Sequence, residues 1–272
     1  MSMPPPPPVA APPFYEVWSD QLLSLLEHLG EVALLTVRTF RSLPKRPWEI
    51  RSTIYQMESL GVRSAGIVTV TSLFIGMVMT IQFAFGLQRF GGLEYIPRVV
   101  VLSFARELAP TLTAIIVGGR IGSGMAAEVG AMNVTEQVDA IRALGADPAK
   151  KLVLPRTVAA ILVMPILSVY ALALGTLGAI FICKVQFDIT PSFFWESALE
   201  STGMGDFLSG LLKTPVFGFI IAIVGCHFGL RTTGGTEGVG TSTTRTVVVV
   251  SIAILVADFM LTKVLLSFFG TP

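Results

Sequence analysis

Two adjacent charged residues, Arg106 and Glu107, lie inside a long apolar stretch of the chain. An ionised side chain in membrane hydrocarbon costs at least about 2.5 kcal/mol unless it is paired or hydrated. Neighbours on a helix point roughly 100° apart, so these two need not pair with each other and could line one cavity. Their residue types fit ion pairs between helices, contact with a substrate, or a relay for ions or protons.

A flexible and aromatic set of side chains lies earlier in the chain. It consists of Ile75, Met79, Gln82 and Phe83. Methionine adapts to irregular apolar shapes and aromatic rings add apolar area, so this surface fits acyl chains. Methionine is also a common filler of helical cores, which is the other interpretation of the set.

The stretch EVGAMNVTEQVDAIRALGADP at 128–148 is typical of a short helix in a soluble protein, although apolar segments flank it on both sides. Asn133, with Glu136 three residues later, matches a capping box, and Gly145 supplies a stop signal. We therefore expect a two-faced helix from Asn133 to Leu144. Its apolar stripe is expected at Val134, Val138, Ile141 and Leu144, and its polar face at Glu136, Asp139 and Arg142. Such a helix could dock on a soluble partner or rest on the lipid surface.

Signals for catalysis, nucleotide binding and nucleic-acid binding are weak. The two histidines, His28 and His227, are far apart, and the sequence has no HExxH or GxSxG motif. The segment GTEGVGTS has the glycine spacing of a P-loop but carries Thr241 in place of the phosphate-binding lysine. A net charge of +1 predicts no partnership with nucleic acid. Cys183 and Cys226 both lie in apolar segments, which favours buried, unpaired thiols over a disulfide.

Composition and hydropathy indicate a membrane protein. Hydrophobic residues make up 52% of the 272 residues and charged residues 14%, whereas soluble domains carry about 25% charged residues. A membrane-spanning helix needs roughly 20 apolar residues. The segments that qualify are 62–87, 97–127, 153–183, 207–230 and 246–269. The expected fold is an all-α membrane protein with five transmembrane helices and a short helix between spans 2 and 3.

The N-terminal region is expected to differ from the spans. Residues 1–13 are rich in proline and predict a disordered tail. Residues 14–60 predict an amphipathic helix in the membrane interface, because charges interrupt the apolar spacing and Trp18 suits headgroup depth. A soluble helix packed on another subunit is the alternative. Residues 61–272 are expected to form the five-span domain.

The distribution of lysine and arginine predicts the orientation of the spans. Cations are enriched on the side that holds the N-terminus, which indicates the cytoplasm and leaves the C-terminus on the outer side. The cytoplasmic set is Arg38, Arg41, Lys45, Arg46, Arg51, Arg63, Arg142, Lys150, Lys151, Arg156, Arg231 and Arg245, against Arg89, Arg98, Lys184 and Lys213 outside.

Three stretches of the sequence resemble one known family. They are ELAPTLTAIIVGGRIGSGMAAEVGAMNVTEQVDAIRALGADPAKKLVLPR at 107–156, SLFIGMVMTIQ at 72–82 and GVGTSTTRTVVVVSIAILVADFMLT at 238–262. These stretches are similar to the MlaE (YrbE) family, the permeases of ABC transporters that work with MCE proteins. The similarity covers about residues 60–270, and the central motif is long enough to be specific.

The resemblance implies that 61–272 is a permease domain and that the chain forms a homodimer in the bacterial inner membrane, with its C-terminus periplasmic. The complex would move phospholipid between this membrane and a periplasmic MCE-domain hexamer, and so maintain outer-membrane lipid asymmetry. ATP and Mg would be held by a separate ATPase dimer, so the chain is expected to be a transport subunit without a cofactor and not an enzyme. A STAS-domain protein is often attached.

The resemblance also implies roles for particular residues. In the family, the helix between spans 2 and 3 is the coupling helix that docks in a groove of the ATPase subunit. This role falls on Asn133, Glu136, Asp139, Ile141 and Arg142. The lipid pocket of the family lies near Arg106 and Glu107, and Ile75, Met79, Gln82 and Phe83 are further candidates for its wall. The alternative is a stand-alone secondary transporter or channel that uses Arg106 and Glu107 as an intramembrane relay.

Overall fold

The computed structural model describes residues 14–44 and 49–269, and within these ranges it contains helices and no strand. Five helical stretches are long and apolar enough to cross a membrane, which confirms the predicted all-α membrane fold. They are Ile50–Gln88, Leu93–Val134, Ala149–Phe187, Met204–Leu230 and Gly235–Phe268. The tail expected at 1–13 lies outside the described residues.

The first span is a single helix, α2 (Ile50–Gln88), which is longer than the predicted segment 62–87. Its 39 residues extend about 58 Å, roughly twice the thickness of the hydrocarbon. Hydropathy marks only the apolar part of such a helix, whereas backbone hydrogen bonds continue beyond it. The expected domain boundary between residues 60 and 61 therefore falls inside one continuous helix.

The second span changes its helical pitch along its length. A 3-10 turn, η1 (Leu93–Tyr95), leads into α3 (Ile96–Ser103), the π-helix η2 (Phe104–Leu112) and α4 (Thr113–Val134). Pro110 lies inside η2, where it has no N–H to donate and its ring disfavours regular α-helical hydrogen bonding. A π-turn accommodates such a break locally, and π-turns occur frequently at functional sites.

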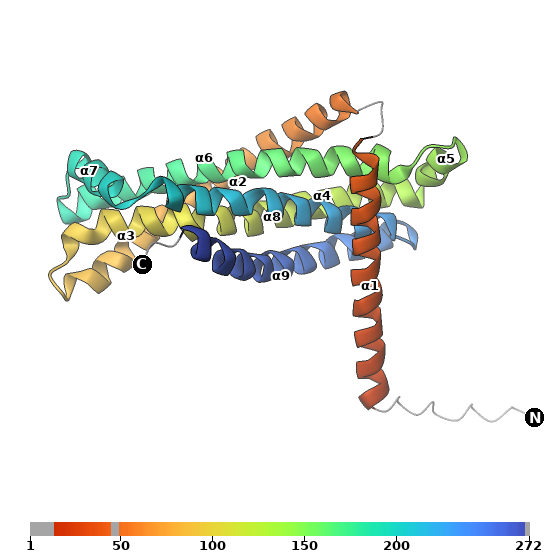
Figure 1. Ribbon diagram of the computed structural model, residues 1–272, viewed down its shortest axis with the longest axis horizontal. Helices are drawn as coiled ribbons and strands as arrows, with labels where there is room; N and C mark the ends of the chain where they lie inside the picture. Colours follow the sequence, from red (N-terminus) through yellow and green to blue (C-terminus); the bar gives the residue numbers. More distant parts are fainter. Residues whose placement is uncertain (1–13, 45–48, 270–272) are drawn as a thin grey trace, which may run out of the picture.

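Two short helices mark opposite ends of the bundle. α5 (Gln137–Ala143) follows α4, and the π-turn η3 (Ala149–Val153) then leads into α6 (Leu154–Phe187). α7 (Pro191–Ser201) follows α6. Figure 1 shows α5 at one end of the bundle and α7 at the other. The connections before and after α6 therefore lie on opposite sides, as a helix that crosses a membrane requires.

Small residues let α4 pack closely on α8 (Met204–Leu230) and α9 (Gly235–Phe269). A Cβ at Gly122 of α4 would lie 3.2 Å from Thr246 Cγ2 of α9, and one at Gly225 of α8 would lie 2.8 Å from the carbonyl oxygen of Gly122. Such close backbone approach stabilises helix pairs in membranes. Gly122 and Gly225 therefore serve helix packing.

The apolar residues of α9 form an exposed stripe along the helix. Val248, Ile252, Val256 and Phe259 are each more than half exposed. Their spacing of three or four residues places them on one face. In a membrane this face contacts lipid or another protein chain.

The helix α1 (Phe14–Ser42) runs across the bundle instead of along it (Figure 1). It packs mainly on α8 and η3. An amphipathic helix in the plane of the membrane would cross the spans in this way. Its placement in the interface stays a prediction, and the side chain of Trp18 is not among those described.

Candidate functional site

A buried lysine of α8 connects three helical segments. The side chain of Lys213 is 1% exposed, and its Nζ lies 2.7 Å from Glu107 Oε2 of η2 and 3.1 Å from Asp258 Oδ1 of α9. Nζ also donates to the Thr262 hydroxyl at 2.7 Å, and this hydroxyl donates to Glu107 Oε1 at 3.2 Å. These four side chains form one hydrogen-bonded group, which we call the Lys213 network.

Arg106 forms a separate ion pair at the start of α8. Its Nε donates to Asp206 Oδ1 at 2.7 Å, and its Nη2 contacts the same oxygen. Asp206 Oδ2 accepts from the backbone N–H of Gly203 at 2.9 Å, so this carboxylate also caps the first turn of α8. Arg106 and Glu107 therefore find partners on other helices and do not pair with each other.

Backbone geometry brings these groups within reach. The π-helix η2 carries both Arg106 and Glu107, and its hydrogen bonds to the fifth residue wind it more widely than an α-helix. Gly210 of α8 lies against η2, because a Cβ there would overlap the carbonyl oxygen of Ala105. Lys213 lies nearly one turn after Gly210 on the same helix face. The close approach at Gly210 thus brings the lysine to Glu107.

The network is closed on one side and open on the other. Lys213 is hidden, whereas the side chains of Glu107 and Arg106 are 40% and 33% exposed. Lys213 carries one positive charge against the two carboxylates of Glu107 and Asp258, and Arg106 balances Asp206. An exposed carboxylate in hydrocarbon is costly. The open side of the network therefore favours water or a polar ligand.

The hollow beside these residues has a volume of about 10 Å³, roughly the room needed for one water molecule. Its lining includes Arg106, Glu107, Lys213 and Thr262 but none of the candidate residues of α2. Ile75, Met79 and Phe83 are half-buried against the core, and Gln82 is exposed. One chain thus holds the charged candidates together and places the apolar candidates on another surface.

Lys213 was not expected to be a site residue. The cation distribution counts it among the outer-side cations, whereas in the structure its side chain is buried within α8. A signal was present, since Asp206 and Lys213 are the two charged residues at the start of an otherwise apolar helix. Asp206 directly precedes the predicted span 207–230, whereas Lys213 lies inside it, where a charge needs a partner.

The predicted helix at Asn133–Leu144 begins later than expected. α4 continues to Val134, so Asn133 lies in its last turn, and α5 starts at Gln137. Glu136 is the N-cap residue with a left-handed φ of 59° and makes no side-chain capping hydrogen bond. The expected capping box is therefore wrong. Asn133 instead donates to the carbonyl oxygen of Thr232 at 3.0 Å and connects α4 to the turn between α8 and α9.

The surface of α5 is mixed. Val138 is fully buried and Ile141 is half-buried, whereas Asp139 and Arg142 are exposed and form an ion pair of 2.8 Å. Leu144, which was expected on the apolar stripe, is 86% exposed. α5 is therefore anchored through Val138 and presents both charge and an apolar side chain away from the bundle.

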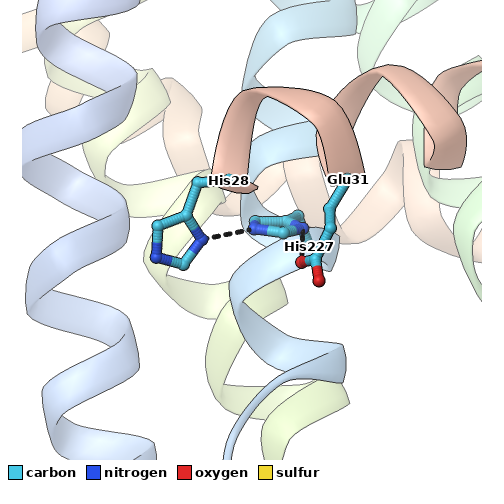
Figure 2. A group of neighbouring side chains, drawn as sticks. All are labelled: His28, Glu31 and His227. Atoms are coloured by element: carbon cyan, nitrogen blue, oxygen red, sulfur yellow. Dashed lines mark hydrogen bonds and ion pairs between the residues drawn. The ribbon is translucent and has the colours of Figure 1, made fainter. Parts of the chain in front are cut away.

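A polar joint connects α1 to the end of α8. His28 Nδ1 and His227 Nε2 lie 3.2 Å apart, although the two residues are distant in the sequence. Figure 2 shows His28 and Glu31 of α1 on either side of His227. Arg231 lies 2.8 Å from Glu31 Oε2 and 3.3 Å from His28 Nδ1. The two histidines are therefore far apart only in the sequence. In the fold they are neighbours, because α1 crosses α8 at this point.

This joint has the residue types of a metal site. The ligand atoms of His28, Glu31 and His227 lie within 4.8 Å of one another, a compact set of ligand types that zinc accepts. The guanidinium of Arg231, however, already pairs with Glu31 and lies beside His28. A divalent cation would meet this positive charge at close range. The arrangement therefore fits a hydrogen-bonded joint between helices better than a metal centre.

Comparison with known proteins gives consistent matches over most of the chain. The sequence profile of the family described as Permease MlaE matches residues 53–264. A probable ABC transporter permease protein of Synechocystis is 45% identical over 93% of this chain and 96% of its own length. Another, of Rickettsia typhi, is 37% identical over 89% of this chain and 94% of its own. The chloroplastic protein TRIGALACTOSYLDIACYLGLYCEROL 1 of Arabidopsis thaliana is 41% identical over 78% of this chain, which covers 61% of that protein.

Proposed function

This chain belongs to the MlaE permease family, and from this membership we propose that it is the membrane subunit of an ABC transporter for phospholipid. It is a multi-pass membrane protein and a transport subunit rather than an enzyme. In the proposed complex, a separate ATPase dimer hydrolyses ATP. Phospholipid moves between the bacterial inner membrane and a periplasmic MCE-domain hexamer, which maintains outer-membrane lipid asymmetry, and a STAS-domain protein is a further candidate partner.

The position of α5 is the observation that carries the proposal. This helix connects two spans at one end of the bundle (Figure 1). It carries the exposed pair of Asp139 and Arg142, and Leu144, directly after it, is also exposed. Val138 anchors α5, and the bond from Asn133 to Thr232 connects the end of α4 to the turn before α9. A partner that moves α5 would therefore act on several spans at once. This is what coupling to an external ATPase requires.

Phospholipid as the substrate is supported by the polar groups within the spans. Arg106 and Glu107 are partly exposed among apolar helices, which suits the headgroup of an amphipathic molecule. Met79 and Phe83 provide apolar surface that suits acyl chains. The name of the Arabidopsis relative is that of a galactolipid, which also favours a lipid.

A homodimer would complete the pocket, because one chain places the charged and apolar candidates on separate surfaces. The exposed stripe of α9 at Val248, Ile252, Val256 and Phe259 offers a face for a second copy. In the proposed orientation, the N-terminus and α5 lie in the cytoplasm, where ATP is available, and the C-terminus is periplasmic. The excess of lysine and arginine on the α5 side supports this orientation.

The test is to express the chain with its genomic neighbours, purify it through a tag on this chain, and reconstitute the product in liposomes. We expect an ATPase to co-purify and labelled phospholipid to pass to a soluble MCE-domain acceptor only when ATP is added. The matched control is the same complex with the phosphate-binding lysine of the ATPase replaced. Transport of ions or protons by the isolated chain, without an ATPase, would instead favour the secondary-transporter alternative.

A further inference from the structure

A second and larger hollow lies between α2, α4 and α9, apart from the Lys213 network. Its volume is about 550 Å³, within the range of small-molecule sites. Its polar lining includes Ser59, Arg63, Arg120, Ser123, Glu128 and Thr244. Two arginines and several hydroxyl groups thus face one space, in which an anion of the size of a lipid headgroup would fit.

The two arginines lack acidic partners within the described part of the chain. Arg120 Nη1 donates to the hydroxyl of Ser64 at 2.7 Å, and no hydrogen bond or ion pair involves Arg63 among the described residues. Glu128, the acidic residue of the lining, lies 3.2 Å from Arg156, which balances its charge. The hollow therefore holds two positive charges that no acidic side chain of the described residues neutralises. Guanidinium groups recognise phosphate through paired N–H donors.

The depth of the hollow matches the headgroup region of a membrane. From Arg63, α2 continues to Gln88, and these residues extend about 38 Å, enough to cross the hydrocarbon and reach the polar region on one side. The bond between Arg120 and Ser64 fixes Arg120 at the same level. α4 then continues from Arg120 towards α5, so the arginines lie on the α5 side of the membrane.

We propose that this hollow binds the phosphate group of a phospholipid headgroup from the leaflet on the α5 side. Arg63 and Arg120 contact the phosphate oxygens, and the hydroxyls of Ser59, Ser123 and Thr244 are available for further hydrogen bonds. The acyl chains lie against the exposed apolar surface of α2 and α9. The inference rests on the proposed function in taking phospholipid as the substrate, and it adds a place where the lipid is held at the α5 side before or after transfer.

The experiment measures binding of radiolabelled dioleoylphosphatidylglycerol to the purified, delipidated full-length chain in detergent, without ATP or partner proteins. Arg63→Gln removes a charge that makes no bond within the described residues, so this variant should fold normally. Together with Arg120→Gln it should weaken lipid binding roughly tenfold or more, because hydrogen bonds to charged groups are among the strong ones. Arg51→Gln is the matched control, because Arg51 is exposed on the same helix outside the hollow, and its binding should match the unmodified chain.

Competing molecules identify the source of the phosphate. Dioleoylglycerol, which has the acyl chains but no phosphate, should bind the double variant as well as it binds the unmodified chain. Inorganic phosphate should compete much more weakly than lipid, and equal competition would assign the site to a free anion and overturn the headgroup. Undiminished lipid binding by a folded double variant would overturn the site itself. The same result is expected if a carboxylate of a second copy, and not a lipid phosphate, occupies the hollow. If the complex still transported phospholipid in that case, the proposed function would stand.

Discussion

At Lys213, each of the three ammonium donors has an acceptor, in Glu107, Asp258 and Thr262. A buried charge is tolerated only when it is paired and its hydrogen bonds are made. The lysine therefore fixes η2, α8 and α9 relative to one another. Glu107 contributes to the same contacts but keeps a partly exposed carboxylate, so its charge can also serve a ligand.

The first prediction follows from this difference in burial. Lys213→Met leaves Glu107 and Asp258 without their cation. We expect the free energy of unfolding to fall by an amount near the low end of the roughly 3 to 5 kcal/mol that is typical of a broken buried pair. Glu107→Gln should cost less, because Asp258 still balances Lys213. Thermal unfolding in detergent measures both, and Lys184→Met, at an exposed lysine near the end of α6, is the control. Equal losses for Lys213→Met and Lys184→Met would contradict a structural role of the network.

The contact of α8 with η2 depends on the absence of a side chain at Gly210. Gly210→Ala would place a Cβ on the Ala105 carbonyl oxygen, which is backbone and cannot rotate away. Overpacking of this kind typically costs about 1 to 3 kcal/mol, and we expect it to separate Lys213 from Glu107. The unfolding temperature in detergent should fall. Gly66→Ala should leave it unchanged or higher, since nothing lies within 4 Å of its Cβ, and a neutral Gly210→Ala would refute the close contact.

The exposed Leu144, directly after α5, provides a test of whether the ATPase docks at this end of the bundle. Leu144→Asp should leave stability nearly unchanged, because surface substitutions have small effects, but it should remove the ATPase from the purified complex. Leu199→Asp on α7 is the matched control, since that leucine is 71% exposed at the opposite end of the bundle. Co-purification of the ATPase, measured by ATP hydrolysis per mole of this chain, distinguishes the two variants. Normal ATPase content in Leu144→Asp would exclude this leucine from the interface.

At the scale of the whole molecule, the orientation predicts which end of the bundle faces the cytoplasm. In a background with Cys183 and Cys226 replaced by alanine, Gln137→Cys on α5 should be protected from an impermeant thiol reagent applied to intact cells with a permeabilised outer membrane. Glu196→Cys on α7 should react. Both positions are exposed in the structure, so burial does not explain a difference. The reverse pattern would place α5 away from ATP and would contradict coupling to an ATPase.

The sequence alone determines the membrane fold and its approximate spans, because hydrocarbon requires long apolar helices whatever their partners. It also predicts the buried, free state of Cys183 and Cys226, which the structure confirms. Local signals are less decisive at helix ends. The capping box at Asn133 and Glu136 fails because the hydrogen bonds of α4 extend past it and Asn133 has a partner at Thr232.

Only the tertiary structure decides which charges meet. Lys213 reaches Glu107 and Asp258 across three helical segments, and His28 reaches His227 because α1 crosses α8. Such pairs depend on helix rotation, on the π-turns of η2 and on the close approach at Gly210, and none of these follows from local spacing. An apolar stretch specifies that a charge within it needs a partner, and the packing of the helices selects the partner.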